Sequence, residues 1–416
     1  MADERQPGNL RNYAVVTAAY WSDTITDGAI RVLVLFYFYE RGYSPFAVAS
    51  LFLLYEVFGI VTNLVGGFLA ARFGLRTTLL GGLATQTLAL SMLAFAPSSW
   101  LVVPYVMAAQ ALSGIAKDLT KMSSKSAVRL VVADGESDLL FRWVSILTGS
   151  KNAIKGVGFF VGGLLLTLVG FQHALMILIA LTSGAIAAVL TLMRGTLGTP
   201  DRRAKFSHMF SNNRAVNMLA AARMFLFASR DVWFVVGVPV FLRSQQGWSF
   251  WQVGCFMAVW VIGYGAVQAS APALLRRRAG GRPTGRTATS LAFALAAFPA
   301  LIAITLTSSL DASAAVVVGL ILFGIVFALN SAVHSFLILH YAEGDRVAMN
   351  VGFYYMANAG GRLTGTVLSG ALYQWQGLDA CLWASSAFVL GAGALSLLLP
   401  REARSPSSPR PVSPVR

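Results

Sequence analysis

The stretch KGVGFFVGGLL (155–165) has a counterpart in RLTGTVLSGAL (362–372), which follows it at an offset of 207 residues. The aligned pairs are Lys155 and Arg362, Gly158 and Gly365, and Gly163 and Gly370. A second pair of stretches, ERGYSPFAVASLFL (40–53) and SQQGWSFWQVGCFM (244–257), aligns at an offset of 205. Two matches at nearly the same offset predict a chain built from two parallel repeats.

The composition is that of a membrane protein. Of 416 residues 56% are hydrophobic and only 12% are charged, and the mean hydropathy is +0.66, whereas soluble domains carry about 25% charged residues. Apolar runs of about 20 residues, long enough to cross a bilayer, recur along the whole chain. They predict twelve spans, at 12–38, 46–71, 76–97, 100–122, 141–168, 172–193, 215–242, 249–275, 287–308, 313–339, 348–372 and 378–399.

These spans divide six and six. We expect an N-terminal bundle (1–193), a basic central loop (194–214), a C-terminal bundle (215–399) and a disordered Pro- and Ser-rich tail (400–416). Two parallel six-span repeats in an all-α polytopic protein resemble the major facilitator fold, whose substrate site lies near the membrane midplane between the halves. GGFLAARFGLRTT (66–78) also resembles the loop motif of that superfamily, although Ala71 stands at the usual acidic position.

The positive charges predict the orientation in the membrane. Most lie on the side of the termini: Arg72, Arg76, Lys125, Arg129, Arg142, Arg194, Arg202, Arg203, Lys205, Arg214, Arg276, Arg277, Arg278, Arg282 and Arg286. The opposite loops carry Arg41 and Arg243. Because cytoplasmic loops are enriched in Lys and Arg, both termini are expected in the cytoplasm. Most of the net charge of +15 then reflects topology, and a nucleic-acid partner is not expected.

Several other classes of function lack their sequence signals. The chain contains no G-x-S-x-G or HExxH motif, and no clustered His or Cys, so we expect no enzyme, cofactor or metal site. Cys255 and Cys381 fall in or near different spans and predict no disulfide framework. The polar start MADERQPGNLRN runs directly into a span and predicts no removable signal peptide.

Thirteen charged residues fall inside the predicted spans, beyond the first two residues of each. Because charge is costly in a bilayer, such residues normally face a polar cavity or each other and mark the transport path. The cations are Arg31, Lys117, Lys121, Lys151, Lys155, Arg223, Arg230 and Arg362, and the acids are Asp23, Asp27, Glu56, Asp118 and Asp231. We expect the cations, with Asn358, to bind substrate, and the acids to include the proton carrier.

For the first-span acids and the fifth-span lysine, two interpretations remain open. Asp23, Asp27 and Arg31 share one helical face, so either Asp27 pairs with Arg31 or one of the aspartates carries a proton. Lys155 either finds an acid on another span or contacts substrate.

Three residues in the second half have narrower expectations. Arg230 has Asp231 beside it, although the two point about 100° apart on a helix. Arg230 or Arg362 is expected to grip a phosphate or carboxylate through two parallel hydrogen bonds. His334 is expected to be a satisfied polar helix residue rather than a proton shuttle.

Eight cations against five acids leave the interior positive, which ion pairs alone cannot neutralise. Lysines can lose their protons on desolvation, and Lys121 can extend its amine to the interface. The remaining explanation is a substrate with more than one negative charge. Lys117 and Lys121 would receive it from the cytoplasmic side.

Long stretches between residues 9 and 399, including YVMAAQALSGIAKDLTKMSSKSAV and RDVWFVVGVPVFLRSQQGWSFWQVG, resemble the ArsJ-type organoarsenical efflux permeases. The resemblance implies export of 1-arseno-3-phosphoglycerate across a bacterial inner membrane. It also implies functional pairing with the glyceraldehyde-3-phosphate dehydrogenase that makes this ester, and hence arsenate resistance. Trivalent arsenic would instead favour thiolates, for which two distant cysteines are too few. The alternatives are a permease for an ordinary organophosphate or other anionic metabolite, a membrane-embedded enzyme, and a non-transporting receptor.

Overall fold

The computed structural model describes residues 7–127, 137–193, 213–279, 283–308, 311–341 and 347–400, and these ranges form helices and short turns only. The helices of the first half are α1 (Pro7–Glu40), α2 (Pro45–Ser50), α3 (Leu53–Phe73), α4 (Leu75–Phe95), the 3-10 turn η1 (Ser98–Trp100), α5 (Val103–Ala127) and α6 (Ser137–Leu192). Those of the second half are α7 (Arg214–Phe234), α8 (Gly237–Ser244), α9 (Phe250–Ala279), α10 (Gly285–Leu306), α11 (Ala312–Tyr341) and α12 (Val347–Ser396).

Some predictions lie outside this description. Nearly all of the predicted central loop and tail lies outside the described residues. So do several of the basic residues from which the orientation was predicted. The side chains of Arg72 and Lys125 are also not described. The domain boundaries therefore stay predictions.

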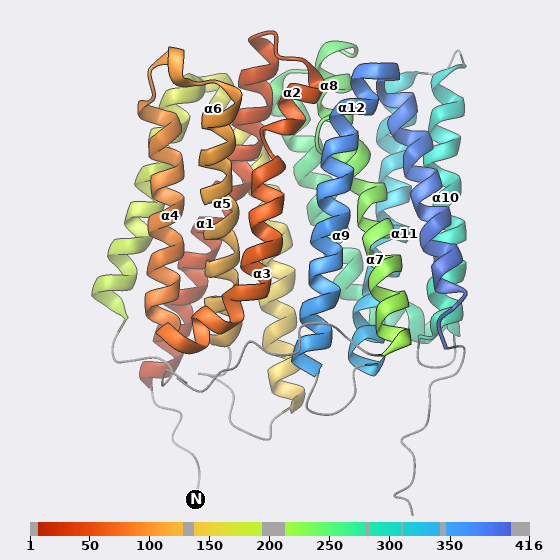
Figure 1. Ribbon diagram of the computed structural model, residues 1–416, viewed down its shortest axis with the longest axis horizontal. Coiled ribbons are helices and arrows are strands. Elements are labelled where there is room, and N and C mark those ends of the chain that lie inside the picture. Colours follow the sequence, from red (N-terminus) through yellow and green to blue (C-terminus); the bar gives the residue numbers. More distant parts are fainter. Residues whose placement is uncertain are drawn as a thin grey trace, which may run out of the picture.

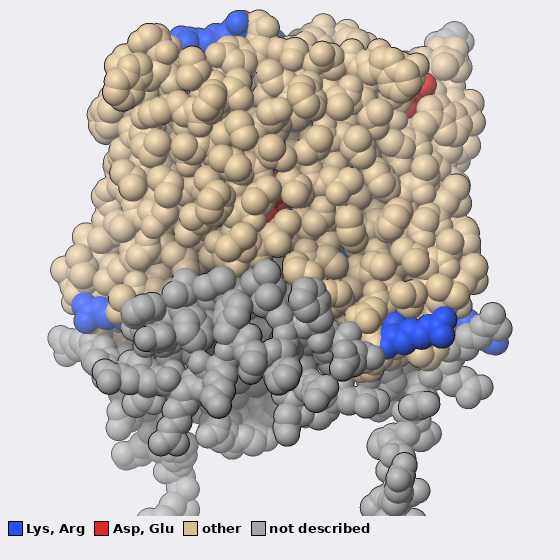
Figure 2. Space-filling model, in the orientation of Figure 1, with Lys and Arg blue, Asp and Glu red and all other residues tan. Residues whose placement is uncertain are grey.

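The described helices cross the protein twelve times, as predicted. Eight stretches are long and apolar enough to span a membrane, and two of these, Ser150–Leu192 and Phe353–Ser396, are 43 and 44 residues long and cross twice. The charged spans α1 and α5 supply the other two crossings. In Figure 2 the visible surface is almost free of charge between two levels at which Lys and Arg appear, as expected for a belt that faces lipid.

The double-length helices α6 and α12 fold back on themselves at equivalent positions of the two repeats. The bend in α6 is at Gly170 (φ 74°) and that in α12 is at Gly377 (φ 71°). Both angles lie in the left-handed region, where a side chain is unfavourable and glycine is not. The two glycines are separated by the offset found in the sequence, so the repeat is present in the backbone as well.

The repeat glycines also make equivalent contacts. A side chain at Gly158 in α6 would stand 2.5 Å from the Ile25 carbonyl oxygen in α1, and one at Gly365 in α12 would stand 2.8 Å from the Ala228 carbonyl oxygen in α7. Close approach of two backbones requires small residues at such positions. The first and fifth spans of each half are therefore packed in the same way.

The two halves lie side by side in Figure 1, with α1 to α6 on the left and α7 to α12 on the right. The side on which α1 begins and α12 ends is called the terminal side here. The opposite side, which carries loops 41–44 and 245–249, is called the far side.

On the far side the halves are in close contact. Gly370 in α12 packs against α2, where a side chain would stand 2.5 Å from the Pro45 carbonyl oxygen, and Gly163 in α6 packs equivalently 2.6 Å from that of Phe250 in α9. Arg243 Nε donates to Glu40 Oε1 at 3.0 Å across the same boundary.

Aromatic rings continue this contact towards the centre. The ring centroids of Phe36 and Phe250 lie 5.1 Å apart, and those of Phe159 and Phe234 lie 6.0 Å apart. Each of these pairs joins one half to the other. The far side is thus closed by apolar packing, with the buried charges beneath it.

Candidate functional site

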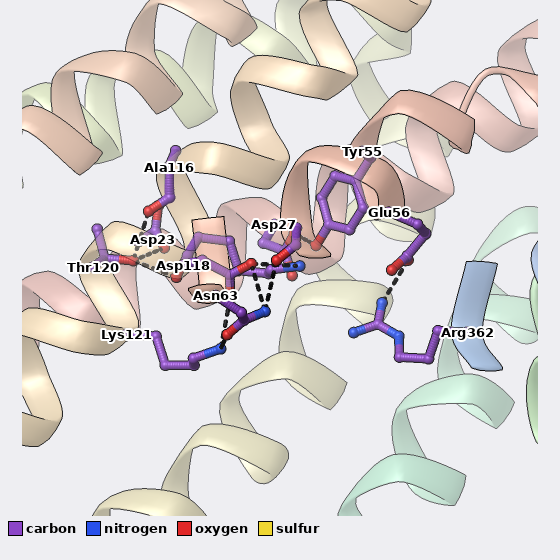
Figure 3. A network of polar contacts seen from close by, with 12 residues as sticks. Asp23, Asp27, Tyr55, Glu56, Asn63, Ala116, Asp118, Thr120, Lys121 and Arg362 are labelled. Carbon is purple, nitrogen blue, oxygen red and sulfur yellow. Dashed lines mark hydrogen bonds and ion pairs between the residues drawn. The ribbon is translucent and has the colours of Figure 1, made fainter. Parts of the chain in front are cut away.

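Glu56 of α3 joins the two halves at the centre of the protein. Its Oε1 accepts a hydrogen bond from Arg31 Nη2 in α1 at 2.7 Å and one from Arg362 Nη2 in α12 at 2.6 Å. Figure 3 shows the contact with Arg362, which crosses the boundary between the halves. The Arg31 guanidinium also lies 4.1 Å from the centre of the Tyr55 ring, a cation–π distance. One carboxylate therefore holds two arginines.

Asp27 is paired with a lysine on another span. Lys155 Nζ in α6 donates to Asp27 Oδ2 at 2.9 Å, and the Tyr55 hydroxyl donates to Asp27 Oδ1. The expected alternative, an ion pair within α1 between Asp27 and Arg31, is wrong, because Arg31 turns to Glu56 instead. Of the two interpretations of Lys155, the structure contains the ion pair.

A second acid, Asp118 of α5, gathers two lysines on the terminal side of this centre. Lys121 Nζ lies 2.6 Å from Asp118 Oδ1 and Lys117 Nζ lies 3.7 Å from Asp118 Oδ2. Asn63 of α3 connects to both partners, accepting from Lys121 at 2.5 Å and donating to Asp118 at 3.2 Å. Figure 3 shows Lys121, Asn63 and Asp118 in one chain of contacts.

Asp23 differs from the other buried acids. Its Oδ2 accepts a hydrogen bond from the Thr120 hydroxyl at 2.6 Å. Its Oδ1 is buried and has no hydrogen-bond partner within the described residues. The residue is 1% exposed, and no cation of the described chain forms an ion pair with it.

The second half contributes Arg230, Asp231 and Arg362. Arg230 Nε donates to Asp231 Oδ1 at 2.6 Å, so these neighbours do meet despite pointing in different directions along the helix. The arginine side chain is long enough to turn back. Arg362 Nε lies 3.4 Å from Asp231 Oδ2, which ties α12 to α7 beside the contact with Glu56.

Arg223 sits apart from these pairs. Its Nε donates to Asn358 Oδ1 at 2.9 Å and its Nη1 donates to the Ser331 carbonyl oxygen at 3.1 Å and hydroxyl at 2.9 Å. His334, one turn from Ser331, is buried with neither ring nitrogen hydrogen-bonded within the described chain. The expectation that His334 is a satisfied polar residue is therefore wrong.

Exposure separates the cations from the acids. The paired acids are sealed, with side chains 1–3% exposed, whereas the six cations that pair with them keep 12–19%. The acids are Asp27, Glu56, Asp118 and Asp231, and the cations are Arg31, Lys117, Lys121, Lys155, Arg230 and Arg362. The acids lie behind the cations, so the open side of the network is positive.

Sequence reasoning found the charged residues but missed the neutral ones that hold them. Tyr55, Asn63, Thr120 and Ser331 each bond to a charged side chain. Hydroxyl and amide groups inside apolar spans were the available signal. Lys151 also has an interaction partner and is half-buried on α6. The described residues contain no group of three metal-ligating side chains, and both cysteines are free.

The comparisons with known proteins agree with this architecture. The crystal structure of the nucleoside transporter NupG is similar over 94% of this chain and 98% of its own, with a TM-score of 0.70 and 12% sequence identity, which is a likeness of fold alone. No curated protein sequence matches the chain. The profile of the Major Facilitator Superfamily matches residues 16–339. The chain belongs to the Major Facilitator Superfamily, and it is a multi-pass membrane transporter with that superfamily's twelve-helix fold.

Proposed function

We propose that the protein is a secondary transporter that exports a small, multiply charged anion from the cytoplasm. One observation carries this proposal: the six cations of the central network keep 12–19% of their side chains exposed, while the four acids paired with them keep only 1–3%. A site for a cationic substrate would have the opposite arrangement, with the acids more exposed than the cations. An anion that brings its own charge completes the pairing that the protein leaves incomplete.

Glu56 gives a mechanism for loading. In the structure it occupies the two arginines that are best suited to an oxyanion, because Arg31 and Arg362 both donate to the same oxygen. A substrate phosphate, arsenate or carboxylate would displace Glu56 from one or both. Since Arg362 belongs to the other half, this exchange would also break a contact that holds the halves together, and so couple binding to rearrangement.

The direction of transport follows from the predicted orientation. With the termini in the cytoplasm, the closed far side faces outward, and Lys117 and Lys121 lie on the cytoplasmic side of Glu56. Those lysines would guide an anion inward to the central arginines. Opening of the far side would then release it outside.

The resemblance to the ArsJ-type permeases supports an arsenate ester as the cargo, and the several negative charges of 1-arseno-3-phosphoglycerate match a network in which cations outnumber acids. In that case a glyceraldehyde-3-phosphate dehydrogenase supplies the substrate, the protein lies in a bacterial inner membrane, and export confers arsenate resistance. The alternative is an ordinary organophosphate, because arsenate and phosphate have nearly the same shape and charge.

Proton exchange is the proposed driving reaction, with Asp23 as the carrier. The other four candidate acids, Asp27, Glu56, Asp118 and Asp231, are each held by a cation. Within the described residues Asp23 has only a hydroxyl donor and one buried oxygen without a partner, an environment in which a neutral carboxyl is less costly than a charged one.

The test uses an arsenate-sensitive bacterial strain from which the host glyceraldehyde-3-phosphate dehydrogenase has been deleted. The transporter and a partner dehydrogenase are expressed singly and together, and growth and cellular arsenic are measured in arsenate. Resistance with lowered arsenic only when both are present supports the arsenate ester. Protection by the transporter alone would indicate direct arsenate export, and no protection by folded protein would favour the organophosphate.

A further inference from the structure

No acid among the described residues neutralises the positive charge of the buried arginine Arg223. It is 5% exposed, and no carboxylate forms an ion pair with it within the part of the chain that the structure describes. Its partners are the Asn358 amide oxygen and the Ser331 carbonyl and hydroxyl oxygens. A buried charge without a counter-charge is strongly unfavourable, so the arrangement needs a reason.

The surroundings of Arg223 orient it without neutralising it. The guanidinium lies 4.1 Å from the centre of the Phe227 ring and 5.2 Å from that of Tyr354, both within cation–π range. Among the described residues, this shell of rings and neutral acceptors contains no negative charge. Such surroundings are suited to an arginine that binds an anionic ligand.

A crowded hydroxyl and an unpartnered imidazole lie beside it on α11, within the described residues. Ser331, which accepts from Arg223, also lies 3.2 Å from the Tyr264 hydroxyl and 3.5 Å from the Gln268 amide nitrogen. His334 lies three residues further along and so on the same helical face; it is 1% exposed, and neither ring nitrogen has a hydrogen-bond partner among the described residues. Buried polar groups normally have partners, and a bound ligand would supply them.

The site has an open side and touches both halves. Asn358, Gln268 and Asn152 are half-buried, so the cluster is not sealed on every side. Asn152 of α6 donates to Gln268 of α9 at 3.5 Å, which connects the cluster to the N-terminal half. Arg223 lies two helical turns, about 10 Å along α7, from Arg230 in the central network.

We propose that Arg223, Asn358, Ser331 and His334 form a second binding subsite, which takes one anionic end of a substrate while Arg31, Arg362 and Lys155 take the other. The favoured substrate class is therefore a short molecule with an anionic group at each end, such as a phosphorylated carboxylate. A single-ended phosphate would fill the central network only. This inference rests on the proposed anion transport and specifies which anions the same cavity selects.

The experiment compares two probes that differ at one end. 3-Phosphoglycerate and glycerol 3-phosphate share a phosphate on three carbons, but only the first has a carboxylate. Binding of each is measured by calorimetry on the full-length protein in lipid nanodiscs, for the wild type and for Arg223→Gln. We expect the variant to lose tenfold or more in affinity for 3-phosphoglycerate and to stay within about twofold for glycerol 3-phosphate, since a lost charge-assisted hydrogen bond is worth more than 1.4 kcal/mol.

Two further variants make the result decisive. Ser331→Ala removes one acceptor that holds Arg223 and should show a smaller loss in the same direction, even if Arg223→Gln fails to fold. Arg362→Gln should weaken both probes. Equal losses for both probes in Arg223→Gln, or no loss for either in Ser331→Ala and Arg223→Gln, would overturn the second subsite alone. A wild type that binds neither probe would refute the organophosphate-like anion site itself.

Discussion

Removal of the Glu56 charge should strengthen substrate binding, although Glu56 lies in the middle of the proposed site. An incoming anion competes with this carboxylate for Arg31 and Arg362, which lie 2.7 and 2.6 Å from it. At an effective dielectric constant of about 20, unit charges about 4 Å apart interact by about 4 kcal/mol. A charged hydrogen bond retains about 1.5–3 kcal/mol of this after desolvation. The variant Glu56→Gln should therefore bind about 10 to 100 times more tightly.

Transport by the same variant should fall, because the ligand no longer triggers release of a contact between the halves. Affinity is measured by calorimetry with 3-phosphoglycerate in chloride-free buffer, and turnover by uptake of labelled substrate into inside-out vesicles. Glu40→Gln is the matched control, since Glu40 also pairs with an arginine of the other half but lies on the far side. Unchanged or weaker binding by Glu56→Gln would refute the view that Glu56 occupies the anion site.

Three other changes test separate parts of the site. Asp23→Asn should abolish the pH dependence of transport and leave binding within about threefold, measured as efflux between pH 6 and 8; retained pH dependence would remove Asp23 as the proton carrier. Lys155→Ala should weaken binding about tenfold or more and leave Asp27 buried without its cation, which should also lower the melting temperature in detergent; wild-type affinity would exclude a role in the anion site. Gly370→Leu should prevent closure of the far side, because the new side chain would overlap α2. Labelling of a cysteine introduced near Phe46 should then increase. Unchanged labelling would show that this contact does not close the pathway.

The fold could be predicted well because it follows from patterns that extend over whole segments of the sequence. Spans follow from apolar runs, and the repeat follows from glycines such as Gly158 and Gly365, which pack α1 against α6 and α7 against α12. Two of these spans, α1 and α5, carry several charges each. Those charges mark the candidate site, so the spans with several charged residues were the most informative about it.

Pairing within the site was harder to predict. Asp27 and Arg31 are one turn apart on α1, yet each prefers a partner on another helix, because the tertiary fold places Lys155 and Glu56 closer in the correct direction. Spacing along one helix predicts on which helical face a residue lies, but it does not predict which residue of another helix faces it. The shell around Arg223 could not be predicted for the same reason, since it draws on α7, α11 and α12.

The paired glycines of the far side have a consequence for leakage. Gly163 and Gly370 bring backbone against backbone at two related places, and neither contact has a flexible side chain that can yield gradually. Rigid surfaces in van der Waals contact lose much of their attraction within a separation of about 1 Å. Separation of the helices at one of these contacts therefore does not open the pathway unless the other contact also separates. This favours a far side that is either closed or fully open. Two such contacts would limit ion leakage through the protein when no substrate is bound. The membrane gradient would then be dissipated only when substrate is transported.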